Sequence, residues 1–231
     1  MKRDLREASI IVAGASGALG HELCRRLIQQ GADLTLLGRD EDKLTGLGLP
    51  GLPIVGDLTD PDACRRAVAG AVAAHGRLDG ILNAAGVVAF GTIDTVSDDA
   101  IDELVGTNFL GPLHLMRAGL ADLEPGGFIA NLSAVVAERP TAGMAVYSAS
   151  KAALTALDHA LARELRRRKI DVIDIRPPHT ETGLAERPIE GVAPRLPQGL
   201  DPGFVADRIV QAMLDGEREL PSNAFSAQAS A

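Results

Sequence analysis

The chain has 231 residues and a mass of 24.0 kDa, enough for one well-buried domain. Its formal net charge of -8 at pH 7 argues against nucleic acid and anionic membrane surfaces as partners. No apolar run is long enough to span a bilayer, and Asp4 and Glu7 interrupt the basic N-terminus that a signal peptide would need. We therefore expect a cytoplasmic protein with a single domain over residues 1–231.

The cysteines and histidines indicate neither a disulfide nor a metal site. Cys24 and Cys64 each fall in a helix-like stretch, where buried free thiols are expected. The five histidines have no metal-ligand spacing along the chain, so the sequence predicts no metal.

Short β-type runs alternate with helical stretches along the chain. The predicted order is strand 9–13, helix 21–28, strand 33–37, strand 52–55, helix 60–76, strand 78–83, helix 108–123, strand 127–132, helix 145–168, strand 170–175 and a last helix that begins at 201–202. Gly31 predicts the end of the first helix, and the two Asp-Pro pairs predict helix starts. The alternation predicts an α/β fold, a doubly wound (Rossmann) parallel sheet with helices on both faces.

Residues 182–199 break this pattern with proline, glycine and charged residues. They lie beyond the carboxyl end of the sixth predicted strand, where doubly wound sheets bind ligands. We expect a substrate loop there, and a simple surface excursion is the alternative.

The first predicted strand leads into a glycine-rich turn, Gly14-Ala15-Ser16-Gly17-Ala18-Leu19-Gly20, and then into a helix. Glycines at such a turn let the backbone approach a pyrophosphate closely, and the helix N-terminus favours its negative charge. A glycine-rich turn without a ligand is the alternative.

Tyr147 is the only tyrosine of the chain, and Lys151 follows it by four residues on a predicted helix. Residues four apart share a helix face, so an ammonium can lie beside the phenol. A nearby positive charge favours the phenolate and lowers the pKa of a tyrosine, which makes such a pair a plausible device for proton transfer.

Together these features resemble the short-chain dehydrogenase/reductase family in its single-domain form. The resemblance runs from Ile10 to about Leu220 and rests on six segments in the family's order. They are the glycine-rich turn, Asn83-Ala84-Ala85-Gly86, Asn108, Ser133 within Asn131-Leu132-Ser133-Ala134, the Tyr147/Lys151 pair, and Arg176-Pro177-Pro178-His179-Thr180-Glu181-Thr182.

The resemblance implies a catalytic role for four residues. Tyr147 would be the general acid or base at a carbonyl oxygen, and Lys151 would lower its pKa and bind the ribose of the nicotinamide half. Ser133 would hydrogen-bond the same substrate oxygen. Asn108 would hold, through its backbone, a water that links Lys151 to solvent.

The resemblance also implies a set of cofactor contacts, with Asp57 at the adenine. The set is Gly14, Ser16, Gly17, Leu19, Gly20, Arg39, Asp57, Leu58, Asn83, Ala84, Gly86, Tyr147, Lys151, Pro177, Thr180 and Thr182. Three positions depart from the family pattern around the cofactor: Ala13 stands for a threonine, Ala84 for an asparagine and Pro178 for a glycine. Pro178 stiffens its loop and removes a backbone donor.

The end of the second predicted strand, Gly38-Arg39-Asp40, bears on the choice of cofactor. NAD preference is normally built by a carboxylate that binds the adenosine ribose, and Gly38 has no side chain. Arg39 suits a 2'-phosphate, so we expect NADP, with NAD as the alternative. Asp40 could pair with Arg39 or cap the segment that follows.

The sequence thus predicts an NADP(H)-dependent oxidoreductase that acts on a small-molecule carbonyl/secondary-alcohol pair. A non-catalytic sensor of the cofactor on the same fold is the alternative. An epimerase or dehydratase of the extended branch would need more residues after Ile175. The candidate substrate contacts are Val88, Phe90, Val135, Arg139, Met144 and the 182–199 loop, although Arg139 also fits a solvated surface position. Family members are often homodimers or homotetramers built on the helices of Asn108 and Tyr147.

Overall fold

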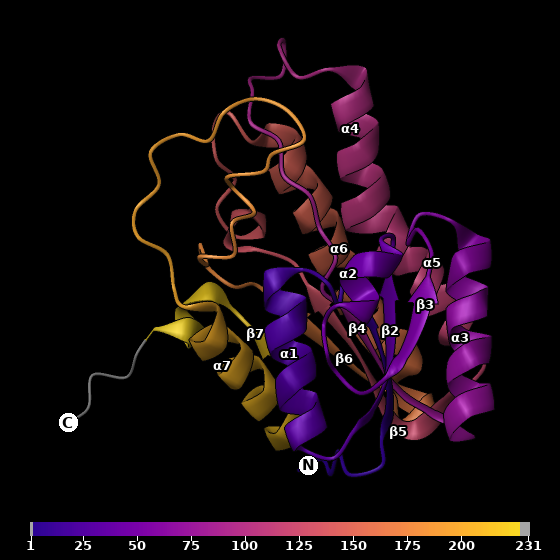
Figure 1. The fold of residues 1–231 in the computed structure, drawn as a ribbon. Coiled ribbons are helices and arrows are strands. Elements are labelled where there is room, and N and C mark those ends of the chain that lie inside the picture. Colours follow the sequence, from indigo (N-terminus) through magenta and orange to yellow (C-terminus); the bar gives the residue numbers. More distant parts are fainter. Residues whose placement is uncertain (1, 227–231) are drawn as a thin grey trace.

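The computed structural model describes residues 2–226 and contains one parallel sheet of seven strands (Figure 1). The strand order across the sheet is β3-β2-β1-β4-β5-β6-β7, and every neighbouring pair is parallel. The strands are β1 (Ser9–Ala13), β2 (Asp33–Gly38), β3 (Leu52–Val55), β4 (Leu78–Asn83), β5 (Leu123–Leu132), β6 (Asp171–Ile175) and β7 (Glu219–Leu220). The order reverses between β1 and β4, which makes this the switch point of a doubly wound sheet.

Helices cover both faces of the sheet. They are α1 (Ala18–Gln29), α2 (Glu41–Thr45), α3 (Pro61–His75), α4 (Asp98–Val105), α5 (Gly111–Gly119), α6 (Ala145–Glu164) and α7 (Pro202–Asp215). A π-helical turn, Gly106–Leu110, joins α4 to α5, and 3-10 turns occupy Val135–Ala137, Leu165–Arg168 and Ser222–Phe225. In Figure 1, α1 and α7 lie side by side on one face, and α3 lies on the other.

The central strand β1 shows why its sequence is a continuous apolar run. All five of its residues are buried, because both faces of the sheet are covered. Ile10 and Val12 pack into the core that includes residues of α1 and α7. Ile11 and Ala13 pack into the core that includes residues of α3, α5 and α6.

Local sequence signals set most helix ends where they were predicted. The Asp60 side chain accepts a hydrogen bond from the Asp62 backbone N–H at the start of α3, and Asp201 caps α7 through the Phe204 N–H. Gly76 ends α3 with φ of 74°, a left-handed conformation that glycine adopts without strain. The predicted fold class and all six predicted strands are present.

The predicted helix 108–123 is wrong at both ends. Helical structure begins at Asp98, where Ser97 caps α4 through the Ala100 N–H, and α5 ends at Gly119. Strand β5 then begins at Leu123 rather than residue 127, with an irregular register before Gly127. The sequence also did not predict β7, whose two residues are too few for a periodic signal.

Residues 182–199 form a loop above the carboxyl ends of the strands, drawn in orange in Figure 1. Its base is closed by backbone hydrogen bonds that link Leu200 to His179 (2.9 Å) and to Glu181 (2.9 Å). Its middle is tied to the segment after β4, since the Phe90 N–H donates to the Glu190 carbonyl over 2.9 Å. Nowhere in residues 2–226 is there a helix both long enough and apolar enough to cross a membrane.

Candidate active site

The glycine-rich turn between β1 and α1 packs so closely against the backbone that side chains would not fit at two of its glycines. Gly14 has φ of 79°, and a Cβ on it would lie 2.6 Å from the Ala85 nitrogen. A Cβ on Gly20 would lie 2.1 Å from the Gly14 carbonyl oxygen. The turn is tied to the next strand end by a 2.9 Å hydrogen bond from the Ala84 N–H to the Ala13 carbonyl. This bond uses only backbone atoms, so the turn is held although Ala13 and Ala84 lack polar side chains.

Two adjoining cavities run along the carboxyl ends of the strands and share Gly17, Ala84, Ala85 and Gly86. The larger, the reaction cavity, has a volume of about 420 Å³ and the smaller, the adenosine-side cavity, about 210 Å³. Of the predicted site residues, the reaction cavity is lined by Gly17, Leu19, Gly20, Ala84, Gly86, Ser133, Tyr147, Lys151, Pro177, Thr180 and Thr182. The adenosine-side cavity is lined by Gly14, Ser16, Gly17, Arg39, Asp57, Leu58, Ala84 and Gly86.

Tyr147 and Lys151 lie one turn apart on α6 and both are buried where they line the reaction cavity. The Lys151 Nζ donates a 2.9 Å hydrogen bond to the Leu132 carbonyl oxygen. Burial raises the pKa of Tyr147 to about 12 and lowers the pKa of Lys151 to about 8, because both charged forms lose hydration. The direction for the phenol is opposite to the sequence expectation, which considered the neighbouring cation and not the burial.

Asn108 and Asn83 are buried beneath the cavities and line neither of them. The Asn108 side chain, in the π-helical turn, accepts a 2.9 Å hydrogen bond from the Val87 N–H and donates to Ser150 Oγ over 3.1 Å. The Asn83 amide donates to Asn131 Oδ1 over 2.6 Å. The Asn83 side chain therefore joins β4 to β5, and a contact of Asn83 with the cofactor stays a prediction.

Ser133 lines the reaction cavity, but its hydroxyl is directed at α6, and its contact with a substrate oxygen stays a prediction. Its Oγ donates a 2.8 Å hydrogen bond to the Lys151 carbonyl and accepts one from Thr155 Oγ1 over 3.1 Å, both on α6. Within residues 2–226, no hydrogen bond joins Ser133 to Tyr147. Ala134, the next residue, instead packs against the apolar cluster that contains Tyr147. The hydroxyl proton is thus used by the Lys151 carbonyl, and Ser133 must leave that bond before it can donate to a substrate oxygen.

We expect Ser133→Ala to lower kcat by less than about tenfold, because the Ser133 hydroxyl is hydrogen-bonded to Lys151 and Thr155 of α6 and not directed at the substrate side of Tyr147. Removing a hydrogen-bond donor that stabilises a developing oxyanion typically costs about 10²–10³ in kcat. Steady-state kinetics of Ser133→Ala beside Ser148→Ala, which alters a buried serine of α6 itself, would check this. A loss of a hundredfold or more for Ser133→Ala alone would show that the hydroxyl turns to the substrate.

Arg39 and Asp57 meet at the outer end of the adenosine-side cavity. Arg39 Nη1 lies 3.8 Å from Asp57 Oδ2, and both side chains are largely exposed. Burial raises the pKa of Asp57, but hydrogen bonds from Thr59 and the nearby Arg39 outweigh it and lower the pKa overall. Asp40 serves as the cap of α2 and accepts a 3.0 Å hydrogen bond from the Lys43 N–H.

The predicted substrate contacts lie on the wall of the reaction cavity, with one exception. Val88, Phe90, Val135 and Met144 line it, whereas Arg139 is exposed and does not. The 182–199 loop contributes Thr182, Leu184, Ala185, Arg187 and Leu196. The sequence did not single out Val136, Thr141 and His179, which also line the cavity. They lie in or beside short irregular segments whose periodicity carries no signal.

The fold and the site define a Rossmann-type oxidoreductase class, with a parallel doubly wound sheet, a tight glycine turn after β1 and a buried Tyr-Lys pair. The family model for short chain dehydrogenases matches residues 8–191. The chain belongs to the short-chain dehydrogenase family and is an oxidoreductase of that type.

Relatives and solved structures agree with this assignment. An uncharacterized oxidoreductase of Staphylococcus epidermidis is 30% identical, with 90% of this chain and 92% of that protein covered. The L-xylulose reductase of Caenorhabditis elegans is 32% identical over 75% of this chain and 72% of that protein. A short chain dehydrogenase from Burkholderia cenocepacia, solved in complex with NADP, superposes with a TM-score of 0.84 at 27% identity, covering 97% of this chain and 100% of that one.

Proposed function

We propose that the chain is an NADP(H)-dependent oxidoreductase that interconverts a carbonyl and a secondary alcohol, with Tyr147 as the general acid and base. One observation carries the proposal: Tyr147 and Lys151, buried on one face of α6, line a cavity that adjoins the glycine turn. The turn suits a dinucleotide, because close packing at Gly14 and Gly20 makes it tight and Gly17 opens onto both cavities. A pyrophosphate would lie over this turn at the N-terminus of α1.

The proton chemistry follows from the two side chains on α6. A bound nicotinamide would supply or accept the hydride. Tyr147 gives its phenolic proton to the carbonyl oxygen as negative charge develops there, and takes a proton from the alcohol in the reverse direction. Lys151 has three N–H donors, of which one is used by the Leu132 carbonyl. The other two are left for ribose hydroxyls, and its positive charge favours the phenolate against the effect of burial.

We further propose that Asn108 serves proton exchange through its backbone. It lies in a π-helical turn, in which the regular helical hydrogen bonds are interrupted. Its side-chain Oδ1 lies close to Gly86, since a Cβ on that glycine would be 3.3 Å from both Asn108 Oδ1 and Lys151 Nζ. In this proposal, a water held by the Asn108 carbonyl links Lys151 to solvent and carries its proton.

The preference for NADP over NAD is argued from Arg39. Gly38 offers no carboxylate to the adenosine ribose, and Arg39 lines the adenosine-side cavity. Asp57, at 3.8 Å, is too distant for a direct hydrogen bond to the guanidinium, so Arg39 is available to a phosphate. The solved relative from Burkholderia cenocepacia binds NADP, which supports the same choice here.

We expect the wild type to bind NADPH at least tenfold more tightly than NADH, about 1.4 kcal/mol. Arg39→Ala should remove most of this difference, because it removes the phosphate partner. Adding Gly38→Asp should reverse the preference by supplying a ribose acceptor, although its Cβ would lie 3.1 Å from Leu44 Cδ2 and Leu44 must shift. Competitive fluorescence titration with both cofactors measures each affinity.

Lys43→Ala is the matched control, since Lys43 is an exposed cation of the same region and pairs with Asp40 at 3.0 Å. It should leave both affinities unchanged. Equal binding of NADH and NADPH by the wild type, or unchanged NADPH affinity in Arg39→Ala, would mean that Arg39 is a surface residue.

The reaction itself is tested by a screen of varied aldehydes and ketones with NADPH. Turnover of any carbonyl that depends on Tyr147 supports the oxidoreductase reaction. Tight NADPH binding without turnover across the panel would favour the alternative, a protein that senses the cofactor on the same fold.

A further inference from the structure

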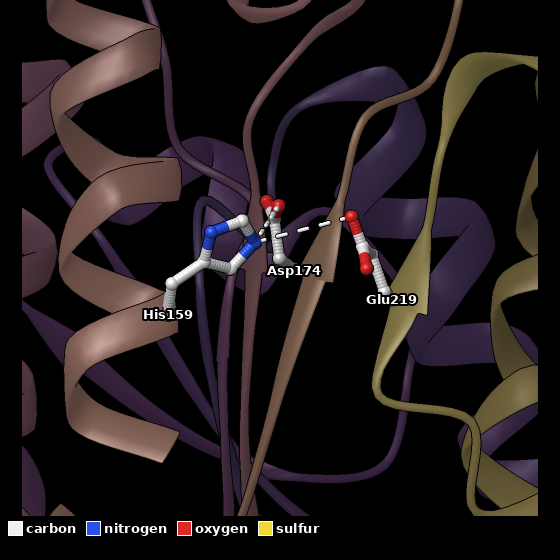
Figure 2. A group of neighbouring side chains, drawn as sticks. All are labelled: His159, Asp174 and Glu219. Atoms are coloured by element: carbon white, nitrogen blue, oxygen red, sulfur yellow. Dashed lines mark ion pairs between the residues drawn. The ribbon is translucent and has the colours of Figure 1, made fainter. Parts of the chain in front are cut away.

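A second group of functional side chains lies away from the reaction cavity, at the β7 edge of the sheet. His159 of α6, Asp174 of β6 and Glu219 of β7 each present one donor atom, and these atoms all lie within 4.8 Å of one another. Figure 2 shows the His159 ring directed at the two carboxylates. His159 Nε2 lies 3.6 Å from Asp174 Oδ2 and 3.9 Å from Glu219 Oε1. None of the three residues lines the reaction cavity.

Strand pairing forces the two carboxylates together. Asp174 and Glu219 are register partners in the parallel pair β6–β7, so their side chains share one face of the sheet. Like charges on neighbouring strands repel, and the arrangement needs positive charge nearby. Arg176 supplies part of it, with Nε 3.2 Å from Asp174 Oδ2 and Nη2 on Glu219.

The single positive charge of Arg176 does not neutralise the negative charge of the carboxylates around it. Its Nε also lies 3.4 Å from Glu138 Oε1, so one guanidinium faces three carboxylates and the group carries a net charge of -2 with His159 neutral. The Asp174 side chain is only 2% exposed. Its Oδ1 accepts a hydrogen bond from Thr155, whereas its buried Oδ2 makes no hydrogen bond within residues 2–226 and has only the ion contact with Arg176 Nε. A buried carboxylate oxygen is costly unless it is fully paired, and this one shares its guanidinium with two other carboxylates and faces the His159 imidazole.

We propose that His159, Asp174 and Glu219 form a binding site for one divalent transition-metal ion, of which zinc is the representative. Imidazole nitrogen and carboxylate oxygen are ordinary zinc ligands, and a divalent charge neutralises the group. In a tetrahedral site with bonds of about 2.1 Å, neighbouring donor atoms lie about 3.4 Å apart. The His159–Asp174 separation is close to that value. Glu219 is 54% exposed, and its carboxylate, which pairs with Arg176 Nη2 through Oε1, would turn toward the ion to close the remaining distance. The exposed side of the site leaves the fourth position to water.

The ion would fasten the sheet edge. β7 has only two residues, and the ligands come from three elements, so a bound ion would join β7 to β6 and α6. Metal that binds the folded chain better than the unfolded one raises the unfolding temperature. The sequence suggested no metal because these ligands are separated by 15 and 45 residues, and only the sheet brings them together.

Isothermal titration of the purified full chain with zinc chloride tests the site, in a non-chelating buffer and with any histidine tag removed. We expect one zinc per chain, and at least tenfold weaker binding in His159→Ala and in Glu219→Gln. A hundredfold zinc excess over Kd should raise the wild-type unfolding temperature by about 5 °C or more and that of His159→Ala far less. Cobalt(II) in place of zinc should give visible absorption that needs His159.

His179→Ala is the matched control. His179 Nε2 also lies 3.6 Å from a carboxylate, Glu181 Oε1, but residues 2–226 give that pair no second carboxylate partner of the kind that Glu219 provides. It should leave zinc binding unchanged. No saturable binding up to about 1 mM zinc, wild-type affinity in His159→Ala, or an equal loss in His179→Ala would overturn the proposal. None of these measurements depends on turnover, so the site and the proposed reaction succeed or fail separately.

Discussion

Tyr147→Phe should lower kcat by about 10²–10⁴ and leave NADPH affinity within a few-fold of wild type. The substitution removes only the phenolic oxygen and its transferable proton. The ring stays packed in the apolar cluster with Val88, Phe90 and Leu104, so the fold should be unaffected. Single-turnover reduction of a carbonyl found in the substrate screen, together with NADPH titration by fluorescence, measures the two terms separately.

The matched change is Phe90→Leu, which alters another ring of the same cluster without touching a proton donor. It should affect the KM of the substrate more than kcat. If Tyr147→Phe keeps more than about a tenth of wild-type kcat, Tyr147 is not the general acid.

Lys151→Ala should damage both catalysis and cofactor binding. In the proposed reaction the Tyr147 phenolate is the base for alcohol oxidation, so we expect the wild-type rate to rise with pH through the pKa of Tyr147. Burial raises the pKa of Tyr147 to about 12, and we expect the ammonium of Lys151 to act against this rise. Without the ammonium the pKa of the phenol rises further, and the pH profile for oxidation moves to higher pH. NADPH affinity should fall by about tenfold, since hydrogen bonds to the ribose are lost.

Lys151→Met separates charge from packing, because methionine retains a long apolar stem in the buried position. It should behave like Lys151→Ala in the pH profile while unfolding at a temperature closer to wild type. Were both variants to show an unchanged pH profile and unchanged cofactor affinity, Lys151 would have no part in the reaction.

Local signals were strong enough to predict most of this fold. Asp60-Pro61 and Gly76 delimit α3 because caps act through adjacent backbone groups, which a sequence shows directly. The elements that the sequence did not predict correctly are those whose formation depends on partners far away in the sequence. Residue 123 belongs to β5 because Leu123 pairs with Leu78, and β7 exists because Glu219 pairs with Asp174.

The same division applies to the site. The glycine turn and the Tyr147/Lys151 pair were predictable, because a turn and a helix face depend on neighbours in the chain. The direction of the Ser133 hydroxyl was not, because it depends on Thr155 and on the Lys151 carbonyl across the β5–α6 contact. Burial of the phenol, which reverses the expected direction of its pKa, likewise arises only from packing. The single domain, the oligomeric state and the cytoplasmic location stay predictions.

Backbone hydrogen bonds hold the loop over residues 182–199 at its base through Leu200 and near its middle through Glu190. The two halves of the loop, on either side of Glu190, contribute differently to the cavities. Four of residues 182–187 line the reaction cavity, namely Thr182, Leu184, Ala185 and Arg187, whereas of residues 191–199 only Leu196 does. Together the two halves also enclose a separate cavity of about 500 Å³. The second half is therefore the natural place for grafts or length changes in protein engineering. Residues added there would enlarge the outer cavity, while the Glu190 tie to Phe90 keeps the inner wall in place.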